Sequence, residues 1–189
     1  AEIAWTRILS VPLGGMVYAL SAILAIYLLG LALGSAAASR VLRAWRAPVA
    51  LFGIVELLLA LLIVGGGHLF GWIPLWQARI IAASGSLRGL FAGDVAITAL
   101  FVLPPTLALG ALFPLAAAIR KRAGGDAGAA VGAVYAANTL GSIAGSVATG
   151  FFLLPFMGLH KTLLLLGAIA LVAAGAALAA ARPRHLLAM

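Results

Sequence analysis

The sequence contains no cysteine, so disulfides, thiolate catalysis and cysteine-ligated metal sites are excluded. It is also poor in charge: only 8% of its 189 residues are charged, against about a quarter in soluble domains. The three histidines, His68, His160 and His185, are far apart along the chain. Because zinc takes three or four converging ligands, no metal site is expected from them.

The few charges are mostly basic and stand between long apolar runs. Twelve residues are Lys or Arg and four are Asp or Glu, which gives a net charge of +8, while 65% of the chain is hydrophobic. A nucleic-acid-binding surface needs a soluble face on which basic residues gather, and here they mark the ends of apolar segments. We therefore expect the lipid bilayer as a partner and no nucleic acid.

Five segments are long enough to cross about 30 Å of hydrocarbon, which predicts an all-α, polytopic membrane helix bundle. They cover residues about 13–39, 47–67, 90–119, 129–157 and 162–181, within a single membrane domain over 1–189. The opening residues AEIAWTR are too short to span and look like the end of an earlier helix. We therefore expect six spanning helices in the complete domain.

The connection over residues 68–89 has two interpretations. Trp72, Trp76, Arg79 and Arg88 suit an amphipathic segment at the membrane interface, because tryptophan favours the headgroup level. An ordinary loop outside the membrane fits the same residues.

The basic residues predict the orientation, since cytoplasmic loops are enriched in Lys and Arg. One side collects Arg40, Arg43, Arg46, Arg120, Lys121, Arg122, Arg182 and Arg184, and the other Arg7, Arg79, Arg88 and Lys161. The first side is predicted to be cytoplasmic, which places the C-terminus there. The expected location is the cell inner (plasma) membrane.

A short internal echo suggests a repeat. GMVYA at 15–19 returns as GAVYA at 132–136, three helices later. Such a period places the two halves in opposite orientations, as in inverted-repeat transporters. The stretch GLALGSAAASRVLR also resembles the loop after the second helix of the major facilitator fold, although its usual Asp is missing. The expectation is an inverted three-plus-three repeat resembling half of that fold.

Small residues recur along two of the segments and predict close helix packing. Gly141 and Gly145 form a GxxxG pair in the fourth segment, and Gly30 and Gly34 form another in the first. The contact lies either within the chain or across a homodimer.

Polar residues inside apolar segments are the candidate binding residues. Asn138 needs hydrogen-bond partners in hydrocarbon, supplied either by another helix or by a polar cavity. Glu56 stands in LFGIVELLLALL, where it must pair, accept hydrogen bonds, face water or hold a proton. Tyr135 and its repeat mate Tyr18 complete the hypothetical substrate-binding set. Pro104, Pro105 and Pro114 fit either a gate or a static bend.

Four stretches of the sequence form a recognisable set: EIAWTRIL, GGMVYALSAILAIYLLGLALGS, GALFPLAA and GAVYAANTLGSIAGSVATGFFLLPFMGL. Together they resemble the N-terminal membrane domain of the bacterial membrane-bound spermidine synthase-like proteins. The resemblance implies a membrane domain followed by a cytoplasmic domain similar to polyamine aminopropyltransferases. The first membrane helix and the catalytic domain of that pattern lie outside these 189 residues.

The chain itself offers no catalytic or cofactor-binding constellation. It has no glycine-rich nucleotide loop with an acidic ribose partner, so no cofactor and no catalytic residue are expected in it. Aminopropyl transfer would need the soluble domain, and enzyme activity of this chain is left open. The first functional hypothesis is a membrane module that anchors or serves a cytoplasmic aminopropyltransferase-like domain. A small transporter or half-transporter and a structural subunit of a larger complex are the alternatives.

Overall fold

The structure of the chain, a computed structural model, describes residues 17–45, 47–84, 87–124 and 126–181. Within these ranges every regular element is a helix. A helix satisfies its own backbone hydrogen bonds, which an apolar chain in a bilayer cannot obtain from water. The predicted all-α fold is therefore confirmed.

The helices are α2 (Val17–Ala44), α3 (Pro48–Leu69), η1 (Phe70–Trp72), α4 (Ile73–Ser84), α5 (Leu87–Arg122), α6 (Ala127–Val147), η2 (Ala148–Leu153) and α7 (Leu154–Ala181). Two of these helices begin at residues that commonly occur at helix N-termini. Pro48 opens α3, where its missing amide hydrogen costs no bond. Asp126 caps α6, and its side chain accepts hydrogen bonds from the backbone N–H groups of Gly128 (3.0 Å) and Ala129 (3.4 Å).

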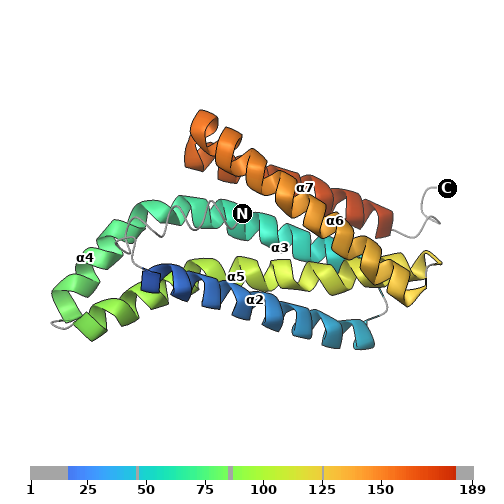
Figure 1. Ribbon diagram of the computed structural model, residues 1–189, viewed down its shortest axis with the longest axis horizontal. Helices are drawn as coiled ribbons and strands as arrows, with labels where there is room; N and C mark the ends of the chain where they lie inside the picture. The colour runs from blue at the N-terminus through green and yellow to red at the C-terminus, as the bar shows by residue number, and fades with distance from the viewer. Residues whose placement is uncertain (1–16, 46, 85–86, 125, 182–189) are drawn as a thin grey trace.

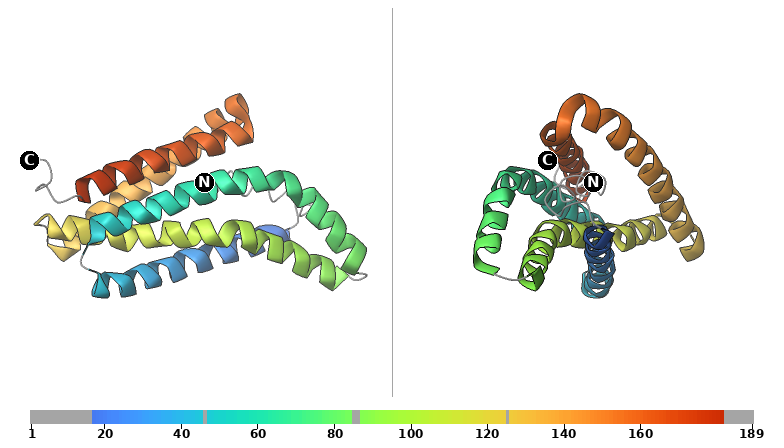
Figure 2. Two further views of the ribbon diagram at one scale, coloured as in Figure 1. Left: turned by 180° about the vertical axis from the view of Figure 1, so that it is seen from behind. Right: turned by 60° about the vertical axis from the view of Figure 1, so that its left-hand side comes forward.

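The helix α5 is the centre of the bundle, because it contacts α2, α3, α4 and α6. The helices α2, α3 and α5 run side by side, and α6 and α7 form a hairpin beside them (Figure 1). The α7 arm packs against α3. The α6 arm diverges from the other helices along its length, as the right-hand view of Figure 2 shows.

Buried apolar side chains form three clusters along α5. The first contains Phe101 and Val102 near α4, the second Ala108 in the middle, and the third Ala111 and Leu115 near the other end. The helices α2, α3, α4 and α7 supply the opposite sides of these clusters. The core thus consists of three small clusters in a row along α5. The helix α6 does not contribute to these clusters.

Four helical stretches within the described residues are long and apolar enough to cross a membrane. The last runs over Ala127–Ala181, and its 55 residues would be about 80 Å long if straight. It instead folds back at Gly158, where φ is +71° and ψ is 174° (Figure 1). The predicted five spans, the six of the complete domain and the repeat remain predictions.

The segment predicted to be interfacial or a loop is largely helical in the described residues. It contains η1 and α4, and α4 forms a hairpin with the beginning of α5 at one end of the molecule (Figure 1). Trp72 is exposed, whereas Trp76 packs against the cluster around Phe101. The helical form suits an amphipathic segment better than an irregular loop.

Gly158 gives a first testable prediction. Its φ and ψ lie in a region that only glycine adopts freely, so Gly158→Ala is expected to destabilise the protein by about 1–3 kcal/mol. The measurement is the free energy of unfolding in mixed SDS micelles, followed by circular dichroism. Gly175→Ala, in an open helical position of α7, is the control and is expected to stabilise by about 0.5–1 kcal/mol. Equal responses of the two variants would contradict the assignment of strain to Gly158.

Candidate functional site

The helices α2 and α5 approach each other closely through glycines and form a firm wall. A Cβ atom at Gly30 would overlap the Thr106 side chain, and one at Gly34 would overlap the Leu107 backbone. Gly110 of α5 meets the backbone of Leu31 of α2 in the same way. Gly30 and Gly34 thus lie in a tight helix contact within the chain.

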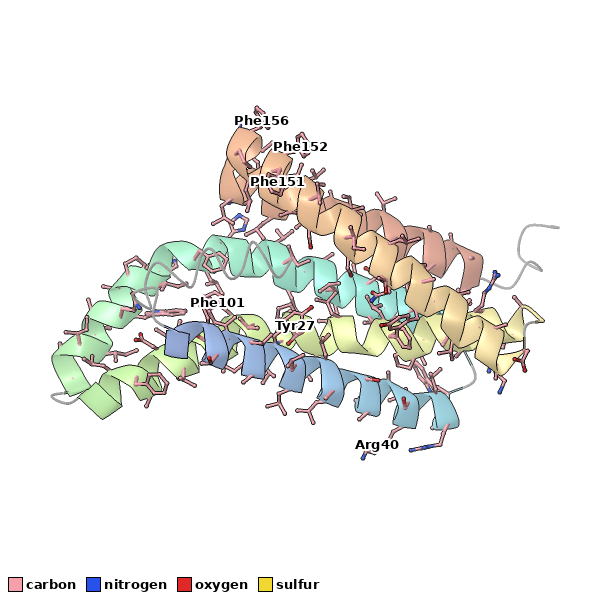
Figure 3. The ribbon with its side chains drawn as sticks, in the orientation of Figure 1. Tyr27, Arg40, Phe101, Phe151, Phe152 and Phe156 are labelled. Carbon is pink, nitrogen blue, oxygen red and sulfur yellow. The ribbon has the colours of Figure 1, made fainter. Side chains whose placement is uncertain are left out.

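A cleft of about 580 Å³ lies between this wall and α6. Its lining comprises Tyr27, Leu31 and Ser35 of α2, Leu109, Gly110 and Phe113 of α5, Asn138, Gly141, Ser142, Gly145 and Ser146 of α6, Thr149 of η2 and Leu166 of α7. Tyr27 lies near the middle of the bundle, whereas Arg40 extends from the far end of α2 (Figure 3). Apolar walls with a few convergent polar groups are typical of ligand sites.

A second hollow of about 490 Å³ lies between α2, α3 and α5. Its lining is apolar, with residues such as Val41, Leu51 and Leu107. It offers no side chain that could orient a ligand by hydrogen bonds, so the cleft beside α6 is the stronger candidate site.

The polar groups of the cleft follow helical periodicity. Asn138, Ser142 and Ser146 are four residues apart and share one side of α6, and Tyr27 and Ser35 are eight apart on α2. Asn138 was predicted to be a binding residue, whereas Tyr27, Ser35 and Ser146 were not. The spacing was a usable signal, but the sequence does not show that the two rows face each other.

The four predicted binding residues do not all meet in the cleft. Asn138 lines it, whereas Tyr135 is 65% exposed and is not part of its lining. Tyr18 belongs to the first turn of α2, and its side chain lies outside the described part of the structure. Glu56 lies on α3, which contributes no lining residue. Their joint role as one site stays a prediction.

Gly141 and Gly145 line the cleft. A Cβ atom at either position would have no neighbour within 4 Å among the described residues. The small-residue face of α6 is therefore open, unlike that of α2, and its role in packing stays a prediction.

Glu56 is half-buried on the side of α3 between its two neighbours in the bundle. Three residues before it, Gly53 faces Leu178 of α7, and three residues after it, Leu59 packs with Ala108 of α5. Within the described ranges, no residue forms a hydrogen bond or ion pair with the Glu56 carboxylate. The site is unusual for a carboxylate, because an uncompensated charge is costly in hydrocarbon.

The prolines of the third predicted segment lie inside a continuous helix. Pro104, Pro105 and Pro114 all belong to α5, and Thr106 donates a hydrogen bond from Oγ1 to the Val102 carbonyl oxygen at 2.8 Å. On the other side of the cleft, Thr149 is buried in the π-helical turn η2. Irregular helical turns are frequent at functional sites.

Comparison with known proteins adds a relative. Over 179 residues the chain is 34% identical to Polyamine aminopropyltransferase 2 of Streptomyces coelicolor. The matching region covers 94% of this chain and 30% of that protein. The chain is homologous to part of a polyamine aminopropyltransferase. The expected resemblance to the spermidine synthase-like family is therefore confirmed, for a chain that spans about 30% of this homologue's length. No family model and no solved structure matches the chain.

Proposed function

We propose that this chain is the membrane module of a polyamine aminopropyltransferase-like protein, and that it anchors a cytoplasmic catalytic domain. The observation that carries the proposal is the homology, which covers nearly all of this chain but only 30% of the homologue. The remaining length of the homologue is ample for a soluble catalytic domain of ordinary size.

The helices of the chain support the same role. Four apolar stretches suit a bilayer, whereas the cleft is lined by uncharged residues and lacks an acid–base pair for group transfer. The excess of basic residues on one side favours a cytoplasmic C-terminus in the inner membrane. A catalytic domain attached there would meet soluble polyamines.

Segment exchange in the Streptomyces homologue tests the proposal. Deleting its 179-residue matching segment, together with the first membrane helix expected before it, is expected to move the rest of that protein from the membrane fraction to the soluble fraction. Replacing the segment by this chain is expected to restore membrane fractionation after alkaline carbonate washing. Aminopropyl transfer to putrescine is measured in the same samples and is expected to persist in the chimera.

Two results would contradict anchoring. The deleted protein could remain in the membrane, or the chimera could stay soluble while this chain alone inserts. A chimera in which Arg120, Lys121 and Arg122 are replaced by Gln serves as a control, because it keeps the apolar helices and removes basic residues that set orientation.

The cleft favours a second candidate, a small transporter or half-transporter. Its polar lining, the prolines of α5 and the π-helical turn resemble the irregular helices of transport sites. Vesicle uptake of putrescine, or of an uncharged solute such as glycerol, that disappears in Asn138→Leu would favour this candidate over anchoring, because Asn138 lines the cleft.

A further inference from the structure

The side chains that line the cleft between α2, α5 and α6 limit the kinds of ligand that it can bind. We propose that it binds an uncharged amphiphile that enters from the bilayer, with several hydroxyl, ester or amide groups joined to an apolar body. This inference goes beyond the anchoring role and does not depend on it.

The lining contains no charged side chain. The acidic residues in the described ranges lie elsewhere: Glu56 on α3, Asp94 near the start of α5, and Asp126 at the cap of α6. Asp94 accepts a hydrogen bond from the Gln77 amide at 3.3 Å. A polyamine cation in the cleft would lose hydration without gaining a counter-charge, which is costly at membrane depth.

Neutral hydrogen-bonding groups form two rows along the cleft. The row on α6 runs from Asn138 to Ser146 and the row on α2 from Tyr27 to Ser35, each eight residues or about 12 Å long. Leu31, Leu109 and Phe113 lie on the walls beside them. A molecule with several neutral polar groups can therefore form hydrogen bonds with these rows while its apolar surface contacts the walls.

Several polar groups of the α6 row lack protein partners. Within the residues that the structure describes, the side chains of Asn138, Ser142 and Ser146 form no hydrogen bond. By contrast, Thr139, on another side of α6, donates to the Tyr135 carbonyl oxygen at 2.9 Å. These three residues are exposed in the structure. An unsatisfied amide that faces hydrocarbon is unfavourable, so a bound polar ligand would stabilise this face.

The size of the cleft suits a small molecule. The 580 Å³ of the cleft falls in the range of about 300–1,000 Å³ usual for small-molecule sites.

Photolabelling of the full chain in phosphatidylethanolamine–phosphatidylglycerol vesicles tests the proposal. The probe is a diacylglycerol with a diazirine and an alkyne in one acyl chain, compared with phosphatidic acid carrying the same chains. Saturable labelling of α6 and α2 peptides by the diacylglycerol probe is expected. Spermidine is expected not to compete.

Three variants locate the labelling. Gly145→Leu adds a side chain to the cleft lining, at a position where a Cβ has no neighbour within 4 Å, and is expected to reduce saturable labelling about tenfold. Asn138→Leu removes one row member at similar volume and is expected to weaken half-saturation about fivefold, as for one hydrogen bond. Gly132→Leu is the matched control, since it is equally open on α6 but outside the lining, and is expected to label like wild type.

Other outcomes would overturn the proposal. Equal labelling of all variants, or by both probes, would show ordinary annular lipid contact only. Competition by spermidine would indicate a cationic ligand. Cross-links between two copies of the chain, abolished by Gly145→Leu in the absence of probe labelling, would show that a second helix occupies the cleft.

Discussion

Gly34→Leu is expected to destabilise the bundle by about 3 kcal/mol or more, the upper range for overpacking a tight contact. A Cβ at Gly34 would overlap the backbone of Leu107, and backbone cannot rotate away as a flexible side chain can. The helices α2 and α5 would have to separate, and the clusters around Val102 and Ala111 would lose contacts. The free energy of unfolding in mixed SDS micelles, followed by circular dichroism, measures the loss.

Gly175→Leu is the matched control for this prediction. It introduces the same side chain into a long apolar helix, at a position of α7 with no neighbour within 4 Å. It is expected to stabilise the protein by about 0.5–1 kcal/mol, because leucine has a higher helix propensity than glycine. If both variants lost the same stability, leucine itself would be the cause, and the α2–α5 contact would not be as tight as described.

Glu56→Leu is expected to stabilise the protein, by about 1–2 kcal/mol. The carboxylate is half-buried among apolar residues of α3 and has no hydrogen-bond or ion-pair partner among the described residues. Replacing a lone polar group by an apolar one of similar size removes the cost of its desolvation. Unfolding of wild type, Glu56→Leu and Glu56→Gln under the same conditions checks the prediction.

Glu56→Gln separates charge from hydrogen bonding, because it keeps the shape and the polar end of the side chain. It is expected to fall between the other two proteins. A Glu56→Leu protein less stable than wild type would mean that the carboxylate has a partner beyond the described residues. A more stable protein that loses ligand binding would instead fit a functional residue retained at a cost in stability.

Much of the fold could be predicted from single residues and their spacing. The turn at Gly158 lies within MGLHK, between the fourth and fifth predicted segments. The predicted segments and the observed helices overlap throughout. In hydrocarbon a single segment can satisfy its backbone hydrogen bonds only by forming a helix. The resemblance to the spermidine synthase-like family was also visible in short stretches of the sequence.

The relations between helices were harder to predict. The sequence shows similar glycine pairs at Gly30 and Gly34 and at Gly141 and Gly145, yet the first pair is tightly packed and the second faces a cleft. His68 and His160 are far apart in the chain, but their rings meet edge to face with centroids 5.6 Å apart. Small residues at helical spacing identify a packing face of a helix. They do not indicate which other helix packs against that face.

The sequence by itself determined the helical class and the apolar character that suits a bilayer, because these depend on composition and local periodicity. It also carried the family resemblance, in specific short stretches. Only the tertiary structure placed Tyr27 and Ser35 opposite Asn138 and left Glu56 outside the cleft. Those positions depend on how α2, α5 and α6 approach one another. Helix packing in lipid is governed by close shape complementarity, which has no signature in a single segment.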